Sequence, residues 1–402
     1  MIHVVSELYY PEETSTGYIL TKIAEGLAET FPVHVITGPP DYSGLKAAPK
    51  SEVRNKVRIE RVRAINLNKN KIASRLLRSI LLSVQLAVKT LKEVRKGDTV
   101  FVVTNPAPLL VIMCLVCRLT RSSLIVLTHD VFPENLQAAQ LIQGNSLSFR
   151  ILSRVFSAIY KASDHIVVIG RDMKEIMRAK INASLPEITV ITNWADTDDI
   201  SPEARASNQI IKSLNLQGKF VVQFAGNMGR VQGIDHIVAA AEILKNEKVH
   251  FIFIGDGAKR KWLVEQVEVR KLKNVKVLDA KPRAEQQLFL NACDVGMVSL
   301  TAGMVGLGVP SKAYNILAAG KPVIAVVDPN SEVGLLVKEE NVGWVVAPGD
   351  SEGLAAVILE ASNFTRLDEM GRRAREVAEH TYSLDAILSK YQELFDHYAS
   401  KQ

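Results

Sequence analysis

Two stretches in the second half of the sequence carry residues of the types and spacing needed to bind a doubly charged anion. Ser311 and Lys312 begin an expected helix in GVPSKAYNILAAGKPVIAV, and Asn315 follows one turn later. Arg230 lies in the glycine-rich turn of AGNMGRVQGID, ahead of another expected helix. An ammonium group, a guanidinium group and the N–H groups at a helix N-terminus are suited to phosphate oxygens. These residues together predict a site for a diphosphate.

Glycines follow several other expected strands. Gly255 and Gly257 flank Asp256 in FIGDGAK, where a base or ribose could approach the backbone closely. Gly229 belongs to the AGNMGRVQGID turn, and Gly17 ends the small-residue turn TSTG before a helix. The TSTG turn is consistent with a phosphate contact or with an ordinary helix N-cap. Neither the dinucleotide spacing G-x-G-x-x-G nor the phosphate loop G-x-x-x-x-G-K-[ST] is present, so the NAD and ATP fingerprints are absent.

Strand-like apolar runs alternate with helical patterns twice along the 402 residues. The first series includes IHVVSEL, VHVITG, TVFVVTN and SLIVLTHD, and the second includes KFVVQFAGN, HFIFIGDG, DVGMVSL and KPVIAVV. This order predicts an α/β protein with two doubly wound Rossmann-like domains facing across a cleft. We expect the boundary at 195/196, in the polar stretch WADTDDISPEARASNQ. Its carboxylates, Asp196, Asp198 and Asp199, are interpreted as turn and cap residues and not as metal ligands.

The formal net charge of +6 is unevenly distributed, because residues 50–98 contain 14 Lys and Arg against four Asp and Glu. Lys71, Arg75 and Arg78 follow helical spacing ahead of an apolar run. Residues around 54–96 are therefore expected either to contact an anionic membrane or to form a solvated helix face. No nucleic acid partner is expected, since no RNA-binding aromatic pattern, zinc spacing or helix-turn-helix signature accompanies the charge.

The three cysteines and the N-terminal sequence bear on the cellular compartment. An odd number of cysteines without a disulfide framework favours a reducing compartment. The sequence MIHVVSELYYPEE lacks a secretion signal, and no apolar run is long enough to cross a bilayer. We expect a cytoplasmic protein, in contact with the inner face of the plasma membrane if the basic region binds lipid.

The chain resembles the retaining glycosyltransferases of family 4, which have the two-domain GT-B fold. The resemblance runs nearly end to end, through PEETSTGY, THDVFPENL, VITNWADTD, FAGNMGRVQGID, FIGDGAK and VPSKAYNILAAGKPVIAV. It is similar above all to bacterial surface-polysaccharide enzymes that include fucosaminyl transferases. The resemblance implies a UDP-sugar donor in residues 196–380 and a lipid-linked or polysaccharide acceptor in residues 1–195. It also implies that a C-terminal helix within 381–402 packs back on the first domain.

The resemblance further implies roles for residues at matching positions. Arg230 and Lys312 would bind the diphosphate without a metal ion or other cofactor, and His129 would lie beside the transferred sugar. These three are the expected catalytic residues, and Asn193 and Asp196 would line the floor of the cleft. The other residues expected at the donor are Gly17, Gly229, Gly255, Asp256, Gly257, Asp279, Lys281, Val309, Ser311 and Asn315.

The sequence departs from the family pattern at two positions. The family usually carries two glutamates with seven residues between them, and here Leu307 and Asn315 occupy these positions. An amide can accept a hydrogen bond from one ribose hydroxyl, but it lacks the charge that strengthens such bonds. Recognition of the sugar would then depend more on the backbone of 303–308, or on Asp130 and Glu134.

The expected reaction is transfer of a hexosyl or N-acetylhexosaminyl group with retention, through an oxocarbenium-like transition state. Positive charge from Arg230 and Lys312 would stabilise the departing diphosphate. Two alternatives remain open at this point. One is a sugar-nucleotide 2-epimerase of the same fold, and the other is a non-catalytic sugar-nucleotide-binding protein.

Overall fold

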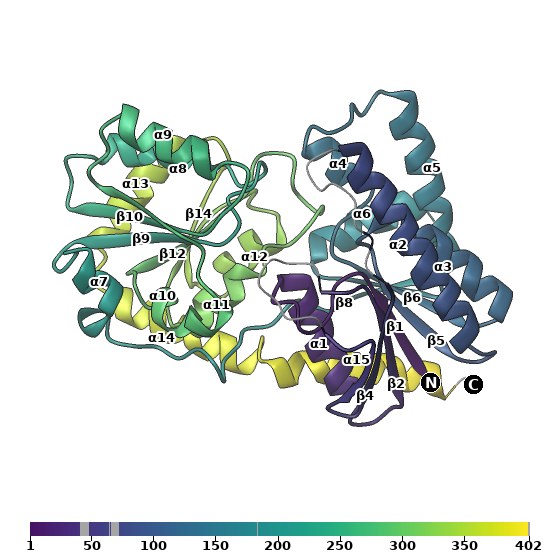
Figure 1. Cartoon of the computed structure of the whole chain (residues 1–402). Helices are drawn as coiled ribbons and strands as arrows, with labels where there is room; N and C mark the ends of the chain where they lie inside the picture. Colours follow the sequence, from purple (N-terminus) through teal and green to yellow (C-terminus); the bar gives the residue numbers. More distant parts are fainter. Residues whose placement is uncertain (41–47, 64, 66–71, 183, 401–402) are drawn as a thin grey trace. The chain divides into compact units, whose positions relative to one another are not determined.

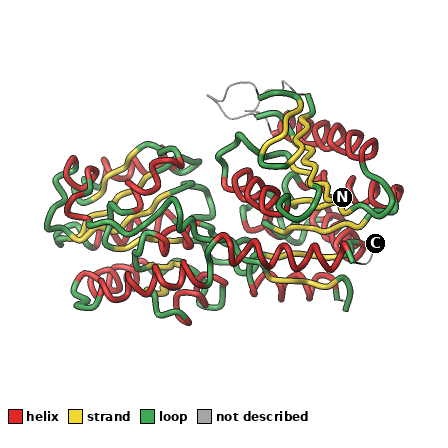
Figure 2. The backbone as a smooth tube through the Cα atoms, turned by 90° about the horizontal axis from the view of Figure 1, so that it is seen from below, coloured by secondary structure: helices red, strands yellow, loops and turns green. Residues whose placement is uncertain are grey.

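The computed structural model describes residues 1–40, 48–63, 65, 72–182 and 184–400. Within it the chain divides into two compact units, Met1–Thr192 with Ile387–Gln402, and Asn193–Ala386. In each unit helices are layered on strands, as Figure 1 and Figure 2 show. Among the described residues no helix combines the length and the apolar character that crossing a bilayer requires. Lys71, one of the three basic residues at helical spacing, lies outside the described residues.

The first unit is built on an eight-stranded sheet with the order β3-β4-β2-β1-β5-β6-β7-β8. All neighbours are parallel except β3, which pairs antiparallel with β4 at the edge. Full burial of β1, β2 and β5 is typical of parallel strands covered on both faces. The strands are β1 (Ile2–Ser6), β2 (Val33–Thr37), β3 (Ser51–Arg54), β4 (Val57–Arg61), β5 (Thr99–Val103), β6 (Ser123–Thr128), β7 (His165–Val168) and β8 (Glu187–Val190).

Helices cover both faces of this sheet. Four crossovers advance the chain in the same direction from β4 to β8, and right-handed crossovers place their helices on one face. On that face α2 contacts α3, α3 contacts α5, and α5 contacts α6. The first connection runs the opposite way, from β1 to β2, which places α1 on the other face. The helices are α1 (Ser15–Leu27), α2 (Ile72–Glu93), α3 (Ala107–Thr120), α4 (Glu134–Ala138), α5 (Leu147–Ala162) and α6 (Arg171–Ile181).

The last helix of the chain, α15 (Leu384–Ala399), completes the core of the first unit. The rings of Tyr391 and Phe395 pack edge to face on Phe101 of β5, with centroids 6.1 and 5.4 Å away. Leu388 fills the space above Gly26 of α1, where any Cβ would collide with it. These contacts join α15 to α1 and β5, which come much earlier in the sequence.

The second unit contains a six-stranded sheet that is parallel throughout, with the order β11-β10-β9-β12-β13-β14. Its strands are β9 (Phe220–Ala225), β10 (Val249–Ile254), β11 (Val275–Leu278), β12 (Val295–Ser299), β13 (Val323–Val326) and β14 (Gly343–Val346). The helices are α7 (Gln209–Ser213), α8 (Ile234–Ile243), α9 (Arg260–Val269), α10 (Gln286–Leu290), α11 (Lys312–Ala318), α12 (Glu332–Glu339), α13 (Ser351–Ser362) and α14 (Leu367–His380). Because the strands are parallel, the loops that follow them meet at one edge of the sheet.

The predicted α/β class with two Rossmann-like domains is confirmed, and the quoted apolar runs are all strands. Strand β3 was not predicted, because it is short and only one of its four residues, Val53, is apolar. It joins β4 through a two-residue turn in which Asn55 and Lys56 both have positive φ, as a tight hairpin requires. The stretch expected to link the domains, 194–209, begins with buried residues that belong to the second unit.

Two histidines are buried side by side under α2 in the first unit. His3 on β1 and His34 on β2 are register partners, and their rings meet edge to face with centroids 5.4 Å apart. His3 Nε2 lies 3.2 Å from a carboxylate oxygen of Asp98, whereas neither ring nitrogen of His34 has a hydrogen-bond partner in the described part of the chain. Burial lowers the pKa of both histidines, to about 4 for His34. Both rings are therefore neutral in the folded protein at neutral pH.

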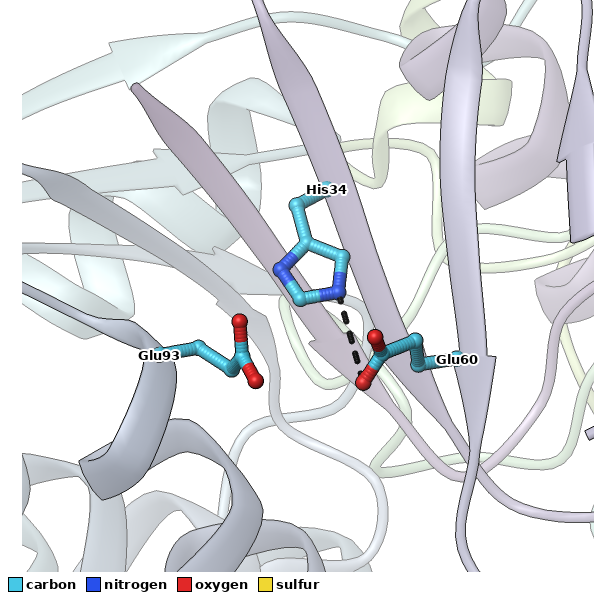
Figure 3. A group of neighbouring side chains, drawn as sticks. All are labelled: His34, Glu60 and Glu93. Carbon is cyan, nitrogen blue, oxygen red and sulfur yellow. Dashed lines mark ion pairs between the residues drawn. The ribbon is translucent and has the colours of Figure 1, made fainter. Parts of the chain in front are cut away.

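Glu60 and Glu93 approach His34 and complete a polar cluster (Figure 3). One ligand atom from each of the three side chains lies within 4.8 Å of the others, and His34 Nε2 is 3.9 Å from Glu60 Oε2. Such a group could hold a metal ion. However, Lys89 and Arg58 each form ion pairs with both carboxylates. A metal ion would have to displace Lys89, so we interpret the cluster as a charge-balanced network.

The buried His34 predicts a specific pH dependence of stability. In the unfolded chain its imidazole regains a pKa of about 6.5, so as the pH falls from about 6.5 towards 4 the unfolded state binds a proton that the folded state does not. This costs up to about 1.4 kcal/mol of stability per pH unit. We expect His34→Gln to flatten the fall in unfolding free energy, measured by urea unfolding at several pH values. His380→Gln, at an exposed position, is the control, and an unchanged slope in His34→Gln would contradict the assignment.

Candidate functional site

The ammonium group of Lys312 stands out among the charged groups of the second unit. Lys312 is the first residue of α11, which follows β12 and its glycine-rich loop. Its Nζ lies 3.7 Å from the centre of the Phe224 ring and 3.5 Å from Oε1 of Gln232. Burial lowers the pKa of Lys312 to about 7, and no carboxylate pairs with it among the described residues. An anion bound here would stabilise the charged form of the ammonium group.

The loops that follow β9, β10 and β12 meet beside this ammonium group. A Cβ on Gly226, directly after β9, would lie 3.4 Å from Lys312 Nζ. Thr301 N donates a 2.9 Å hydrogen bond to Val231 O, which ties the loop after β12 to the loop after β9. Gly255, directly after β10, has φ +147°, and a Cβ there would collide with Gly226 O. The half-buried Lys312 is thus bordered by backbone segments that only glycine allows to come so close to each other.

Arg230 lies in the same loop after β9 and is exposed. Its guanidinium group makes no hydrogen bond or ion pair with the residues that the structure describes. Gly229 before it is half-buried against the side chain of Asn227. The fold therefore brings Gln232, Gly226 and Lys312 together, and it places Arg230 on the same loop with its side chain free to meet a ligand.

Asp256 and Gly257 hold the loops after β9 and β10 against each other. Asp256 O accepts a 2.8 Å hydrogen bond from Met228 N, and Lys259 N donates to Met228 O. Gly257 has φ +147°, and a Cβ there would lie 2.5 Å from the side-chain oxygen of Asn227. The glycines are explained by this close backbone packing, while a contact of Asp256 with a ligand stays a prediction.

The two residues expected near the base are both engaged in ion pairs at the surface. Asp279 pairs with Arg260, and Lys281 pairs with Glu285. The Asp279 side chain is 93% exposed. Both residues follow β11, an edge strand of the sheet, and neither is joined to Lys312 by any contact described here.

The loop before α11 is shaped mainly by apolar packing. Leu307, at the first family glutamate position, is buried, and its N–H donates to Met304 O. Val309 packs against the apolar core of the second unit. Ser311 is half-buried and its hydroxyl makes no capping hydrogen bond with α11.

Asn315 occupies the second family glutamate position, and both the oxygen and the nitrogen of its side-chain amide make hydrogen bonds. Its Oδ1 accepts from Asp196 N at 3.1 Å, and its Nδ2 donates to Asp196 Oδ2 at 3.3 Å. Asp196 is buried and also accepts hydrogen bonds from Trp194 Nε1 and from Arg283. The amide therefore ties α11 to the segment at which the chain enters the second unit. A role of Asn315 toward a ribose stays a prediction, since a ribose would have to share these bonds.

In the first unit, His129 and its neighbours follow β6. Nε2 of His129 is buried and has no hydrogen-bond partner in the described chain, and burial lowers the pKa of this histidine to about 4. Burial raises the pKa of Asp130 to about 6. Glu134, the first residue of α4, accepts a 2.7 Å hydrogen bond from the buried Lys180. A neutral imidazole with an unpaired buried nitrogen is suited to a sugar hydroxyl.

Gly17 is accounted for by the start of α1. Its N–H donates a 3.3 Å hydrogen bond to Thr14 Oγ1, the N-cap of the helix, and a Cβ on Gly17 would lie 2.8 Å from Glu12 O. The N-cap interpretation is thus realised, and a phosphate contact stays a prediction. Sequence reasoning missed Gln232, Phe224, Lys180 and Arg283, because nothing in their local sequence marks the distant residues that they contact.

The contact between Asn315 and Asp196 predicts how the chain would respond to the family residue. Asn315→Glu removes the donor and places a second carboxylate beside a buried aspartate, so we expect a loss of about 2 kcal/mol of unfolding free energy. The double variant Asn315→Glu/Asp196→Asn places the carboxylate at position 315 and the amide at position 196, so one donor and one acceptor still face each other. Chemical denaturation of the two single variants and the double variant should show a favourable coupling of about 1 kcal/mol or more. Additive losses would mean that the two side chains do not interact.

Comparison with known proteins finds family matches along most of the chain. Residues 17–199 match the family model described as Glycosyltransferase Family 4, and residues 206–377 match that described as Glycosyl transferases group 1. A Pseudomonas aeruginosa protein described as probable glycosyltransferase WbjE is 37% identical over 401 residues, which are 97% of this chain and 96% of that protein. The putative colanic acid biosynthesis glycosyl transferase WcaI of Escherichia coli (strain K12) is 25% identical over 57% of this chain and 56% of its own length.

Solved structures share the fold at low sequence identity. Sucrose-phosphate synthase from Thermosynechococcus elongatus superposes with a TM-score of 0.80 at 17% identity, over 100% of both chains. HepE of Anabaena, in complex with UDP, gives 0.72 at 16% identity, over 98% of this chain and 99% of its own. The predicted family, the GT-B architecture and the assignment as an enzyme are confirmed. The chain belongs to the family 4 glycosyltransferases.

Proposed function

We propose that this glycosyltransferase moves a hexosyl or N-acetylhexosaminyl group from a UDP-sugar to a lipid-linked or growing surface-polysaccharide acceptor. The transfer proceeds with retention and without a metal ion. The observation that carries the proposal is Lys312, a partly desolvated ammonium group without a carboxylate partner in the described chain, set among the loops after β9, β10 and β12. A diphosphate would supply the missing negative charge.

The choice of UDP rests on the structural relatives. HepE of Anabaena has been solved with UDP, with UDP and glucose, and with UDP-glucose. Its identity to this chain is at most 16%, so it supports the choice of nucleotide through the shared fold alone. For the sugar, the proposal names a class only, a hexosyl or N-acetylhexosaminyl group.

In the proposed reaction, Lys312 and Arg230 bind the two phosphates of the donor. As the bond between the anomeric carbon and the phosphate oxygen breaks, negative charge grows on the diphosphate, and both cations stabilise it. The neutral imidazole of His129 holds a hydroxyl of the transferred sugar through its unpaired nitrogen. The departing phosphate oxygen takes the proton of the acceptor hydroxyl, which attacks from the same face, so no separate general base is assigned.

The first expected outcome concerns the donor site. Calorimetric titration should show binding of UDP in preference to GDP and ADP. Lys312→Met and Arg230→Gln should each weaken UDP binding at least tenfold, because each removes a charged contact to phosphate. Lys261→Gln, on the exposed surface of α9, is the matched control and should bind as wild type. Wild-type affinity in both test variants would rule out this diphosphate site.

The second outcome follows from the lowered pKa of Lys312. Above pH about 7 the free site has lost much of its charge, so UDP binding must take up a proton and should weaken by up to tenfold per pH unit. Titration in buffers of different ionisation enthalpy measures this proton directly. Lys312→Arg, which stays charged, should bind UDP with no fall in affinity between pH 7 and 9. A fall of equal size in both proteins would contradict the assignment.

The third outcome concerns the chemistry. Activity should survive removal of divalent cations by EDTA, because Lys312 and Arg230 provide the positive charge. The product of a reaction with a UDP-α-sugar should have the α configuration, as read from its anomeric proton coupling by NMR. Loss of activity with EDTA that Mg²⁺ restores would disprove metal independence, and a β product would disprove retention.

A further inference from the structure

The outward face of α2 is apolar. Seven large aliphatic side chains on this helix are each between 41% and 58% exposed, whereas Leu82 and Leu86 on the opposite side are buried against the sheet. A helix on a globular surface normally turns charged residues to the solvent. The exposed residues follow helical spacing in two neighbouring rows that form one stripe, namely Leu76, Leu77, Ile80, Leu81, Val84, Val88 and Leu91.

The two neighbouring helices continue this apolar surface. On α5, Leu147, Ile151 and Val155 are 72%, 51% and 39% exposed and follow one another at four-residue intervals. On α3, Leu115 and Leu119 are 56% and 74% exposed. Since α2 contacts α3 and α3 contacts α5, the three stripes lie on adjacent helices of the same face (Figure 1). We call the exposed face of α2, α3 and α5 the three-helix surface. Its apolar stripes form a patch of the kind that marks an interaction site.

The charge of the three-helix surface is almost entirely positive. The sequences of α2, α3 and α5 contain one acidic residue, Glu93, which lies at the last position of α2 and is paired with Lys89. Eight basic residues accompany it, and those described as exposed are Lys92, Arg118, Arg150, Arg154 and Lys161. Apolar side chains flanked by Lys and Arg are the composition that lies flat on an anionic membrane.

A shallow, open hollow on α5 carries groups that could contact lipid phosphates. It has a volume of about 300 Å³ and is lined by Arg154 and Lys161, with the hydroxyls of Ser153 and Ser157 and the methyl of Ala158. Arg150, Arg154 and Lys161 lie along one side of the helix, next to the apolar stripe that runs through Ile151. Cationic and hydroxyl groups would thus reach headgroups while the aliphatic groups enter the acyl region.

The three-helix surface extends to the edge of the sheet where His129 lies. Helices α2, α3 and α5 lead directly into the parallel strands β5, β6 and β7, and such crossover helices run antiparallel to their strands, so the N-terminal ends of the three helices lie at the carboxyl edge of the first sheet. Leu76 and Leu77 are near the start of α2, and Leu147 is the first residue of α5. His129 and Asp130 follow β6 at this same edge. A membrane on the three-helix surface would therefore bring lipid-linked molecules to the residues expected around the sugar.

We propose that the three-helix surface is a docking site for an anionic lipid bilayer. A second copy of the chain does not fit it, because two such surfaces would place Arg and Lys against Arg and Lys. From the sequence, membrane contact around residues 54–96 was one of two alternatives, beside a solvated helix face, and the structure adds apolar surface beyond that region on α3 and α5. The proposal deepens the proposed function, since it identifies where a lipid-linked acceptor would be met, but its test does not depend on transferase activity.

Vesicle sedimentation with the full chain tests the proposal, using phosphatidylcholine vesicles with and without phosphatidylglycerol. We expect binding to the anionic vesicles. The apolar variant Leu81→Gln/Val84→Gln/Val88→Gln should bind at least tenfold more weakly. Arg150→Gln/Arg154→Gln should lose about fivefold for each arginine at low salt, and less at high salt because the attraction is screened.

Matched controls separate the docking site from general surface effects. Ile243 and Val269 are 53% and 75% exposed on α8 and α9, outside the three-helix surface, and Ile243→Gln/Val269→Gln should bind vesicles as wild type. UDP titration of every variant without lipid shows whether the donor site is intact. If the wild-type protein binds UDP but not anionic vesicles, the docking proposal alone is overturned. If it binds anionic vesicles but not UDP, the proposed donor site alone is overturned.

Two further outcomes would also overturn the docking proposal. One is an equal loss of vesicle binding in the control variant Ile243→Gln/Val269→Gln, which would show that exposed aliphatic side chains contribute to binding wherever they lie on the surface. The other is concentration-dependent dimerisation in sedimentation velocity that the apolar variant abolishes, together with no vesicle binding by wild type. That result would make the three-helix surface a protein interface.

Discussion

The second unit is organised around the ammonium group of Lys312, which has lost part of its water and has no carboxylate partner among the residues that the structure describes. Removing an ammonium group from water without a counter-ion destabilises its charged form, and the lowered pKa of Lys312 expresses this. The Phe224 ring beneath Nζ offsets part of the cost through a cation–π contact. Glycines at 226 and 255 let the surrounding backbone come close. A parallel sheet is what allows three separate loops to meet around a single side chain.

Asn315 stands where the family usually has a glutamate, and here its side chain makes a structural contact with Asp196. A carboxylate here would face Asp196, which is already held by Trp194 and Arg283. The amide satisfies both the N–H and the carboxylate of Asp196 at once, since it carries a donor and an acceptor. Leu307 has likewise become a core residue. Both departures from the family pattern thus have a local reason in packing or hydrogen bonding.

Most of the fold could be predicted from the sequence, because buried parallel strands are short and apolar on both sides. The edge strand β3 was missed because its residues are mostly polar and do not show this apolar pattern. The positions of Lys312, Arg230 and His129 after strands also followed from the sequence. The bond between Asp196 and Asn315 could not, since 119 residues separate them. Nor could the outward face of α2, because its aliphatic residues lie on both the buried and the exposed sides, so the sequence pattern does not indicate which side meets the core.

The way in which the chain passes between its units has a consequence for synthesis on the ribosome. The second unit is one continuous stretch, Asn193–Ala386, and it can fold as soon as that stretch has emerged. The first unit, although translated earlier, needs Tyr391 and Phe395 to cover Phe101. The part of its sheet around Phe101 therefore stays uncovered until α15 has been translated. The unit whose translation begins first is thus completed after the second unit.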